Sequence, residues 1–388
     1  MKPDIEADIV VVGAGLVGLA AAIACAKQGK KVIVVDAKKT AIKKQQAWDA
    51  RIYALTAHTE TWLKALGVWA EVDTSRVNVI SGMQLWDAQD NKLALYDDDA
   101  NLDKLGVIIE NQNLMYALNQ RISALGVTVI TDAEGVFLKH AQQHVSLGLA
   151  DGRHISTNLM IAADGVDSWV RSQANIAVKQ KDFNQTAIVA NYVVEKPHQN
   201  IARQWFAPHE TLALLPMPKQ HVSMVWALST KQAAELLMSS GEGLAEKVQA
   251  RSQNELGGLR AVGKVLSFSL RQQTAAQLIA ERVVLVGDAA HLLHPMAGQG
   301  MNLGLRDVRQ LQEMLTNTHA MQDIGEHGFL RKYARARQAD VATMNTLTSG
   351  LDALFANESE VINKVAGWGF KQLNRQATLK KFLIQQVA

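Results

Sequence analysis

Three separate runs of the sequence end an apolar stretch with glycine and an acidic residue. The first, IVVVGAGLVG, is followed by a second apolar run, KKVIVVD, that ends at Asp36. The other two, LMIAADG and VVLVGDA, contain Asp164 and Asp288. Glycine lets a backbone come close to a ligand, and a carboxylate accepts hydrogen bonds from hydroxyl groups. This combination is typical of a nucleotide site, and the three runs are its candidate parts.

The first run carries the spacing G-x-G-x-x-G, at Gly13, Gly15 and Gly18, between a predicted strand and a predicted helix. The first glycine makes a tight turn, the second admits a pyrophosphate, and the third lets helix and strand pack closely. The helix N-terminus then faces the negative charge. Asp36 ends the next strand, where it can accept hydrogen bonds from the adenosine ribose, which favours FAD or NAD over NADP.

Two kinds of segment alternate along the chain. Residues 7–36 are predicted to form strand, turn, helix and strand, and their continuous apolar strands indicate a parallel sheet covered on both faces. Other segments alternate polar and apolar residues, as antiparallel strands do. The predicted fold is therefore α/β: a discontinuous Rossmann-like dinucleotide domain (1–75, 101–177 and 271–330), an inserted antiparallel-sheet substrate domain (76–100 and 178–270), and a C-terminal helical region (331–388).

Composition excludes several classes of protein. The 388 residues are 48% hydrophobic and 20% charged, which suits two domains with a large core. A net charge of +3 gives no sign of nucleic-acid binding, and one cysteine, Cys25, excludes an intrachain disulfide. The N-terminal run does not resemble a signal peptide, and no apolar segment reaches the roughly 18 residues that span a bilayer. We therefore expect a cytoplasmic protein, either soluble or peripheral on a membrane.

Together, the three runs resemble the signatures of the FAD-dependent aromatic hydroxylases, the para-hydroxybenzoate hydroxylase class. The stretch HPMAGQGMNLGLRDV is most similar to the branch of ubiquinone-biosynthesis hydroxylases, and the resemblance covers nearly the whole chain. It implies that the dinucleotide domain is an FAD-binding domain. It also implies a hydrophobic phenolic substrate and O₂.

The resemblance assigns roles to residues of the third run. It implies that Asp288 binds the ribityl chain of FAD and that the loop from Pro295 to Asn302 passes along the isoalloxazine ring. Backbone N–H groups near Gln299, Gly300 and Met301 would then meet the pyrimidine end of the ring, with Gly298 in the same loop. A helix N-terminus favours the negative charge of reduced flavin, typically by about 0.3–1 kcal/mol.

Further cofactor contacts follow from the same resemblance. Asp164, with Gly165, Ser168 and Arg171, corresponds to the motif that the family uses around the pyrophosphate and, in some members, a nicotinamide donor. Arg51 matches an arginine that contacts the FAD phosphates, as a bidentate donor should. Asn111 or Gln112 falls where the family places another residue touching FAD.

Other candidate residues have simpler interpretations. His291, His294 and Asp288 have a spacing that suggests a metal site, but the flavin interpretation uses the same residues better, and we predict no metal. Ser168 lacks the surroundings of a nucleophile. Trp205, Phe206 and Trp226 are either part of a sheet core or the lining of an apolar substrate pocket.

The C-terminal residues 361–388 contain five basic residues and no acidic residue. Apolar residues lie between them, in the pattern of a basic amphipathic helix. Such a helix can bind an anionic membrane surface or a quinone-biosynthesis complex, and it can equally be a terminal helix that packs on the protein. The basic residues are Lys364, Lys371, Arg375, Lys380 and Lys381; the apolar ones are Trp368, Phe370, Leu373, Leu379, Phe382, Leu383 and Ile384.

The working hypothesis is an FAD-dependent monooxygenase that hydroxylates the ring of a polyprenylated phenol in ubiquinone biosynthesis. In this chemistry reduced flavin and O₂ form a C4a-hydroperoxide, from which water must be kept away. No second G-x-G-x-x-G is found, so electrons would come from transiently bound NAD(P)H or from a redox partner. The general base that activates the phenol stays open among His209, His221, Tyr192 and Tyr53, and no catalytic residue is assigned.

Two alternatives share the same cofactor site. One is another reaction on this scaffold, either hydroxylation of a different aromatic compound or modification of a polyprenyl chain. The other is a flavin-binding assembly subunit of a quinone-pathway complex, with little turnover of its own. Rapid donor oxidation with a phenolic lipid would exclude the second alternative.

Overall fold

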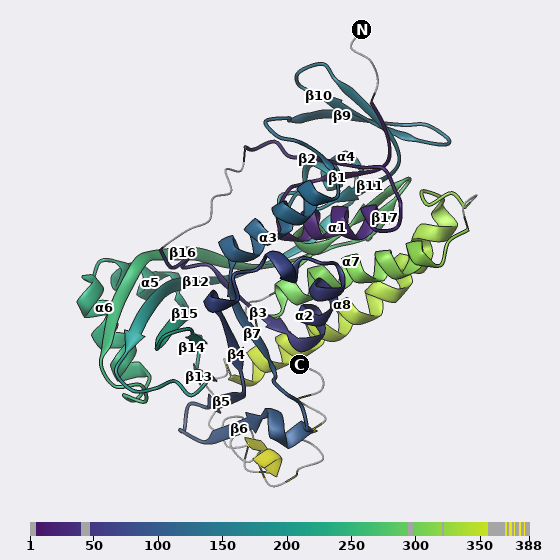
Figure 1. Ribbon diagram of the computed structural model, residues 1–388. Coiled ribbons are helices and arrows are strands. Elements are labelled where there is room, and N and C mark those ends of the chain that lie inside the picture. Colours follow the sequence, from purple (N-terminus) through teal and green to yellow (C-terminus); the bar gives the residue numbers. More distant parts are fainter. Residues whose placement is uncertain are drawn as a thin grey trace.

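The computed structural model describes residues 5–39, 47–293, 298–319 and 322–355, together with 369–370, 372–374, 376, 380–381 and 384. Over these residues the chain forms two large sheets, a small sheet and a set of helices (Figure 1). The predicted α/β class is confirmed. Pro295 and His294 lie outside the described residues, as does much of the C-terminal segment.

The first sheet contains the strands that were expected to be parallel. Its order is β17-β18-β11-β1-β2-β8, and β18, β11, β1, β2 and β8 run parallel. A hairpin, β9–β10, adds to β11 in the antiparallel sense. The strands are β1 (Ile5–Val12), β2 (Val32–Val35), β8 (Thr128–Ile130), β9 (Gly135–His140), β10 (Val145–Leu149), β11 (His154–Ala162), β17 (Ile279–Ala280) and β18 (Val283–Leu285).

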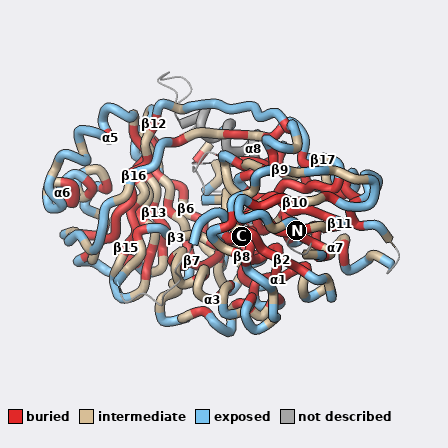
Figure 2. The backbone as a smooth tube through the Cα atoms, turned by 90° about the horizontal axis from the view of Figure 1, so that it is seen from above, coloured by how far each residue is buried: buried red, intermediate tan, exposed pale blue. Residues whose placement is uncertain are grey.

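Helices cover this sheet because its strands are apolar on both faces. Ile9, Val10 and Val11 follow one another in β1 and are all fully buried. Figure 2 shows the same concentration of buried residues along the strands, with exposed residues mainly in the loops. α1 packs against α3 and α7, and α8 runs beside α7 (Figure 1). These helices are α1 (Leu16–Ala26), α3 (Asn111–Ala124), α7 (Gly300–Thr316) and α8 (His327–Phe355).

The second sheet has the order β19-β16-β12-β15-β14-β13-β5-β6. One face packs on the helices α5 (Thr230–Leu237) and α6 (Gly241–Arg251), around side chains such as Tyr192 and Trp226. The strands are β5 (Gly82–Trp86), β6 (Lys92–Tyr96), β12 (Val178–Val194), β13 (Ile201–Ala207), β14 (Glu210–Met217), β15 (His221–Ser229), β16 (Leu259–Ala275) and β19 (His291–Leu292).

One pair of strands in this sheet departs from the antiparallel expectation. β5 and β13 run parallel, with Ile201 opposite Gly82 and Trp205 opposite Trp86. The two strands come from separate segments of the chain, so no hairpin turn fixes their relative direction. The remaining neighbours of β12, β13, β14 and β15 are antiparallel.

A small antiparallel sheet, whose strands interleave in sequence with those of the two large sheets, contacts the second sheet. It has the order β3-β7-β4, and β4 and β7 contact β14. An apolar cluster fills this contact, and described residues of the C-terminal segment, Phe370 and Ile384, are buried in it. The strands are β3 (Ile52–Thr56), β4 (Val77–Ile80) and β7 (Gly106–Glu110), and the helix after β3 is α2 (Ala57–Ala65).

Candidate functional site

The three glycines of the turn after β1 serve two different purposes. Gly13 has φ +108°, and a Cβ atom there would lie 2.3 Å from the carbonyl oxygen of Ala163. A Cβ atom on Gly18 would lie 1.9 Å from the carbonyl oxygen of Gly13. A Cβ atom on Gly15, in contrast, would meet nothing within 4 Å. Two glycines therefore serve close packing of the chain, whereas the third keeps a surface clear.

That surface is the N-terminus of α1. Gly15 is the N-cap residue, no side chain caps the helix, and its first turn contains no acidic residue. The first backbone N–H groups of a helix have no partner inside the helix and attract negative charge. An open glycine at this position is the geometry that a pyrophosphate requires.

Asp36 lies beside the same turn, at the end of β2. One carboxylate oxygen accepts the backbone N–H of Ala14 at 2.6 Å, and the other accepts that of Lys38 at 2.7 Å. The side chain therefore connects the two strand ends of the fingerprint. Each carboxylate oxygen can accept a second hydrogen bond, so the group can still bind a ribose hydroxyl.

The second motif is a loop held by its own acidic residue. Asp164 accepts hydrogen bonds from the Ser168 hydroxyl and from the backbone N–H of Val170, and burial raises the pKa of its carboxyl. Ser168 is also the N-cap of α4 (Trp169–Gln173), where its Oγ accepts the N–H of Arg171. Ser168 thus has a structural role in the part of the chain described.

Arg171 joins the second motif to the third. This buried guanidinium donates to the carbonyl oxygen of Ala289 at 2.9 Å and to that of Val166 at 2.9 Å. Since Ala289 directly follows Asp288, the two motifs are held together by one side chain. The three runs that are far apart in sequence therefore meet at the same ends of β1, β11 and β18.

Asp288 lies in a single turn of 3-10 helix, Gly287–Ala289, after β18. Its side chain is accessible to solvent, yet enough protein surrounds it for desolvation to raise the pKa of its carboxyl. His291 and Arg51 are near enough to oppose that rise. An acid that is accessible to water and still surrounded by protein is the arrangement of a ligand-binding recess. Arg51 itself is exposed and lies 5.2 Å from the centre of the Phe268 ring.

A buried cluster supports this turn, and sequence reasoning missed it. Asp307 of α7 accepts the backbone N–H of Gly287 at 2.9 Å and contacts His291 Nε2 at 2.7 Å. Arg337 of α8 donates to its other oxygen at 2.7 Å. All of these side chains are buried. The sequence could have indicated this cluster by one charged residue at a core-facing position of each of two helices. Charged residues are rarely buried without a partner, so two such residues suggest a buried ion pair.

The start of α7 contains most of the predicted flavin loop. Gly298 has φ +61°, Gln299 is the N-cap, and no side chain caps the helix. A Cβ atom on Gly300 would meet nothing within 4 Å, as at Gly15. Met301 follows in the first turn, which contains no acidic residue. This helix start therefore also presents backbone N–H groups that have no partner inside the helix, beside an open glycine.

The side chain of Asn302 forms hydrogen bonds with the backbone of β3. Its amide donates to the carbonyl oxygen of Ala54 at 2.9 Å and accepts the backbone N–H of Thr56 at 3.1 Å. The buried side chain thus pairs with the backbone of β3 and fixes the position of α7 on that strand.

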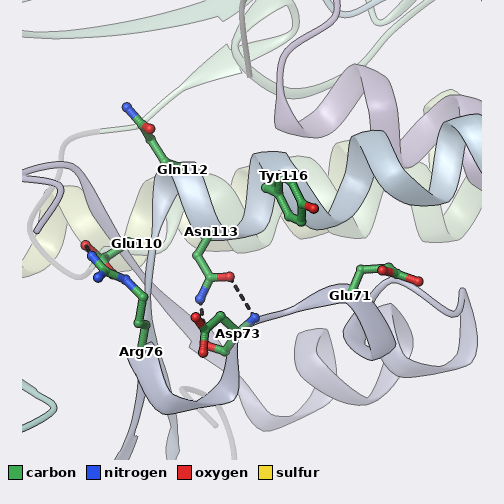
Figure 3. A pocket seen from close by; sticks show the side chains of 7 residues that line it. All are labelled: Glu71, Asp73, Arg76, Glu110, Gln112, Asn113 and Tyr116. Carbon is green, nitrogen blue, oxygen red and sulfur yellow. Dashed lines mark hydrogen bonds and ion pairs between the residues drawn. The ribbon is translucent and has the colours of Figure 1, made fainter. Parts of the chain in front are cut away.

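Asn111 and Gln112 begin α3, next to the loop that precedes β3. The Tyr53 hydroxyl donates to the side-chain oxygen of Asn111 at 3.3 Å, and the backbone N–H of Gln112 donates to Asp49 at 3.2 Å. Figure 3 shows a small polar recess in which Asn113 is bonded to Asp73 while the Gln112 side chain points the other way.

The same recess contains a bidentate ion pair. Arg76 donates to both oxygens of the buried Glu110 at 2.7 Å, and its guanidinium lies 4.4 Å from the centre of the Trp48 ring. Glu110 also accepts the backbone N–H of Asp49 at 2.6 Å. These contacts hold the loop that leads to Arg51, so the recess positions the site and does not itself form its centre.

The four candidate bases have unequal surroundings. Burial raises the pKa of Tyr53 to about 12, although Arg51 opposes the rise. Burial also raises the pKa of Tyr192, which lies on the helix-covered face of the second sheet. His209 is exposed in the turn between β13 and β14. His221 lies 4.9 Å from Trp48, and because two carbonyl oxygens contact its Nδ1, that nitrogen carries the proton.

The remaining candidates have structural surroundings. Burial raises the pKa of the Cys25 thiol to about 12. Trp205 is stacked on Trp86 at 4.7 Å, and both lie with Trp226 on the helix-covered face, whereas Phe206 lies in the apolar cluster on the opposite face. Among the described residues, no three His, Cys, Asp or Glu side chains lie close enough together to hold a metal ion.

The chain is similar to known proteins both in sequence and in fold. A family model described as an FAD binding domain matches residues 6–348. The chain belongs to this FAD-binding family. The clear surfaces at Gly15 and Gly300, the two uncapped helix starts and the acid at Asp288 fit the phosphates, ring and hydroxyl-bearing chain of such a cofactor.

Named relatives of the chain are similar over nearly its whole length. It is 31% identical to the ubiquinone hydroxylase UbiL of Rhodospirillum rubrum, over 98% of this chain and 89% of the relative. It is 30% identical to the ubiquinone biosynthesis monooxygenase COQ6 of Homo sapiens, over 96% and 91%. Among solved structures, the p-nitrophenol 4-monooxygenase PnpA of Pseudomonas putida has the same fold, with a TM-score of 0.81, 16% identity and coverage of 99% and 98%.

The described part of the chain contains no helix with the length and apolar character needed to cross a membrane. The described residues of the C-terminal segment pack on the protein. Phe370, Leu373 and Ile384 join the apolar cluster of the second sheet, and Lys380 forms an ion pair with Asp99 at 2.9 Å. Trp368, Leu379, Phe382 and Leu383 lie outside the described residues.

Proposed function

We propose that this protein is an FAD-dependent monooxygenase that hydroxylates the aromatic ring of a polyprenylated phenol in ubiquinone biosynthesis. The observation that carries the proposal is similarity over nearly the whole chain to relatives named for that pathway. The meeting of three motifs at one sheet edge supports it, because that edge is where such folds bind a dinucleotide.

The proposed cofactor ligands divide among the parts of FAD. Gly13, Gly15 and Gly18 with the start of α1 would hold the pyrophosphate, and Asp36 the ribose of the adenosine. Asp288 would bind the ribityl hydroxyls, and Gln299, Gly300 and Met301 the pyrimidine end of the ring. The side chain of Asn302 would support this loop through β3. Further proposed ligands are Arg51, Asn111, Gln112, Asp164, Pro295 and Gly298.

When bound and reduced, FAD supplies the activation of O₂. The protein's part is to orient the phenol and to keep water away from the reacting atoms. The apolar cluster formed by β3, β7 and the second sheet reaches Ala54, whose Cβ would lie 3.7 Å from a Cβ atom placed on Gly298 of the proposed flavin loop. We infer that a hydrophobic substrate enters on this side, next to the half-buried start of α7.

His221 is the best-placed of the four candidate bases. With the proton on Nδ1, its neutral ring has an Nε2 lone pair that can accept the proton of a phenol. It lies on the strand position opposite Met217, which belongs to the apolar cluster. Burial raises the pKa values of Tyr53 and Tyr192 further above neutrality, which makes both less able to act as a base.

The electron donor and any attachment to a membrane belong to the proposal as well. We infer NAD(P)H or a redox partner as the donor, since the fold carries one dinucleotide fingerprint. Because Phe370, Leu373 and Ile384 face the protein, a contact with an anionic membrane or a pathway complex would involve the basic side chains of this segment.

Quinone profiling by mass spectrometry tests the proposal in a host deleted for this protein. We expect a polyprenyl phenol one oxygen short of the normal intermediate to accumulate. The wild-type gene should restore the quinone pool, and the Asp288→Ala variant should not. Arg309→Gln, which removes an exposed ion pair of α7, is the matched control and should restore it.

A second measurement separates the alternatives. Purified protein reconstituted with FAD is given NADH or NADPH together with a short-chain prenyl phenol, and product oxygen is followed with ¹⁸O₂. Incorporation of one labelled oxygen into the ring supports the proposal. In the deletion experiment, an unchanged quinone pool in a host without a paralogue would refute a role in ubiquinone biosynthesis. In the reconstitution experiment, protein that binds FAD but does not oxidise NADH or NADPH would favour the assembly subunit.

A further inference from the structure

We propose that Asp307 and Arg337 are positioning residues for the flavin site, which act by fixing the turn that carries Asp288. The inference rests on the proposed FAD site. Neither residue lies in one of the three motif runs as a ligand, and Arg337 belongs to α8, a helix with no proposed contact to the cofactor.

Three groups contact the Asp307 carboxylate. One oxygen accepts the backbone N–H of Gly287 and contacts His291 Nε2, at 2.9 and 2.7 Å. The other accepts Nε of Arg337 at 2.7 Å. A carboxylate held on both oxygens has one orientation, so the Gly287 N–H has one position.

Gly287 determines the shape of the turn that carries Asp288. Gly287 has φ +59°, a conformation that glycine adopts readily, and it immediately precedes Asp288. A Cβ atom on Gly287 would lie 3.2 Å from Val17 of α1, and one on Gly304 of α7 would lie 3.1 Å from the Gly287 Cα. The turn is thus packed against two helices, while its direction is set by the hydrogen bond to Asp307.

Helix α8 contacts both the end of β18 and Asp307. Arg337 also contacts Asp340 at 2.5 Å, and the Tyr333 hydroxyl donates to the carbonyl oxygen of Leu285 at 3.0 Å. Tyr333 and Arg337 are one helical turn apart and both are buried. α8 therefore holds the end of β18 at Leu285 and, through Asp307, the turn that follows it.

The charges around Asp307 stabilise its ionised form. Burial disfavours the charged form of Asp307, but His291 and Arg337 outweigh this cost and lower the pKa of its carboxyl. Removing Arg337 would leave a buried carboxylate with fewer donors, which can relax only by moving or by taking up a proton. Either change alters the bond to Gly287 and so displaces Asp288.

Arg337→Met, Arg337→Lys and Asp307→Asn test the inference in the full-length protein. For each we expect FAD to bind about ten- to a hundredfold more weakly than to wild type, the loss expected for a charged hydrogen bond, with Arg337→Lys the least affected. Arg309→Gln is the matched control, since it removes an exposed ion pair between Arg309 and Glu313 of α7 that lies outside this cluster. FAD affinity is measured by the quenching of its fluorescence.

A second readout excludes a general loss of stability. At saturating FAD, the midpoint potential of the bound flavin should shift in Arg337→Met, shift less in Arg337→Lys and stay at the wild-type value in Arg309→Gln. Wild-type affinity and potential in a folded Arg337→Met variant would overturn the inference. If the wild-type protein itself does not bind FAD, both the proposed site and this inference are refuted. That result differs from a loss of FAD binding that is confined to the variants.

Discussion

Asp288 follows Gly287 in the chain and Asp307 accepts the backbone N–H of that same glycine, yet the pKa values of the two carboxyls are shifted in opposite directions. Desolvation raises that of Asp288, which Arg51 and His291 only partly oppose. For Asp307, His291 and Arg337 outweigh the burial cost. The turn therefore carries a carboxylate that the fold leaves in need of a partner, and it is held by a second carboxylate, on α7, that the fold stabilises.

Asp288→Asn should increase the stability of the protein in the absence of FAD and weaken FAD binding. A carboxyl with a raised folded pKa contributes stability below its unfolded pKa, about 3.9, and loses it as pH rises through the folded value. At neutral pH the wild type therefore bears a cost that asparagine does not. We expect a higher melting temperature without FAD and an affinity about ten- to a hundredfold lower.

Thermal melts from pH 4 to 8 and FAD titrations check this prediction. The advantage of Asp288→Asn should grow as pH rises above 4. Asp167→Asn is the control, because that acid is exposed and paired with Arg271 at the same edge. A variant less stable than wild type at neutral pH would contradict the expectation.

Asp307→Asn should have the opposite effect on stability. A lowered folded pKa contributes stability above the unfolded pKa, about 3.9, and this is lost as pH falls through the folded value. Breaking a buried pair by removing one partner costs about 3–5 kcal/mol. The free energy of unfolding, measured by denaturant at several pH values, should show this loss at pH 7 and a smaller difference below pH 4. A difference that is the same at both pH values would speak against the ion pairs as its source.

Gly15→Ala and Gly18→Ala should separate ligand binding from folding. The methyl group of Gly15→Ala has free space, so we expect a stability change below about 1 kcal/mol but FAD binding weakened at least about tenfold. The methyl group of Gly18→Ala would overlap the Gly13 carbonyl, which should destabilise the protein by about 1–3 kcal/mol or more. Melting curves with and without FAD distinguish the two, and normal FAD affinity in Gly15→Ala would remove this helix start from the proposed site.

Ile384→Ala should destabilise the second sheet although the residue is near the C-terminus. Its side chain is fully buried in the apolar cluster with Phe370, and loss of such a side chain costs about 2–5 kcal/mol. Lys381→Ala, at an exposed position, should change stability by less than about 0.5 kcal/mol. Unfolding followed by circular dichroism tests both. Equal stabilities would mean that this segment is not docked on the sheet in solution.

Local patterns in the sequence predicted the parts of the fold that depend on neighbouring residues. The buried strand at Ile9–Val11, the glycine turn and the following helix form one continuous segment, so periodicity and turn chemistry were sufficient. The parallel pairing of β5 with β13 was not predictable in this way, because it depends on a contact between separate segments. The proposed domain boundaries stay a prediction.

The candidate site shows the same division. Gly15, Asp36 and Asp288 could be selected because each follows an apolar strand. Asp307 and Arg337 could not, since their function depends on two helices packing together far along the chain. The apolar residues of the C-terminal segment show a related ambiguity. An amphipathic pattern indicates that one face is buried but does not identify what buries it, and here the second sheet does so for Phe370 and Ile384.

The long strands β12 and β16 have a mechanical consequence. They pair from Val178 opposite Ala275 to Val194 opposite Leu259, and β16 also pairs with β19 just after the turn of Asp288. The proposed cofactor site and the proposed substrate side are thus joined by one long ladder of hydrogen bonds, which is interrupted by register shifts near Asp182 and Val189. Bulges of this kind increase local twist. Relative motion of the two ends would then resemble the torsion of a ribbon, in which a rotation at one end is transmitted to the other, and would differ from the swing of two bodies on a loose tether.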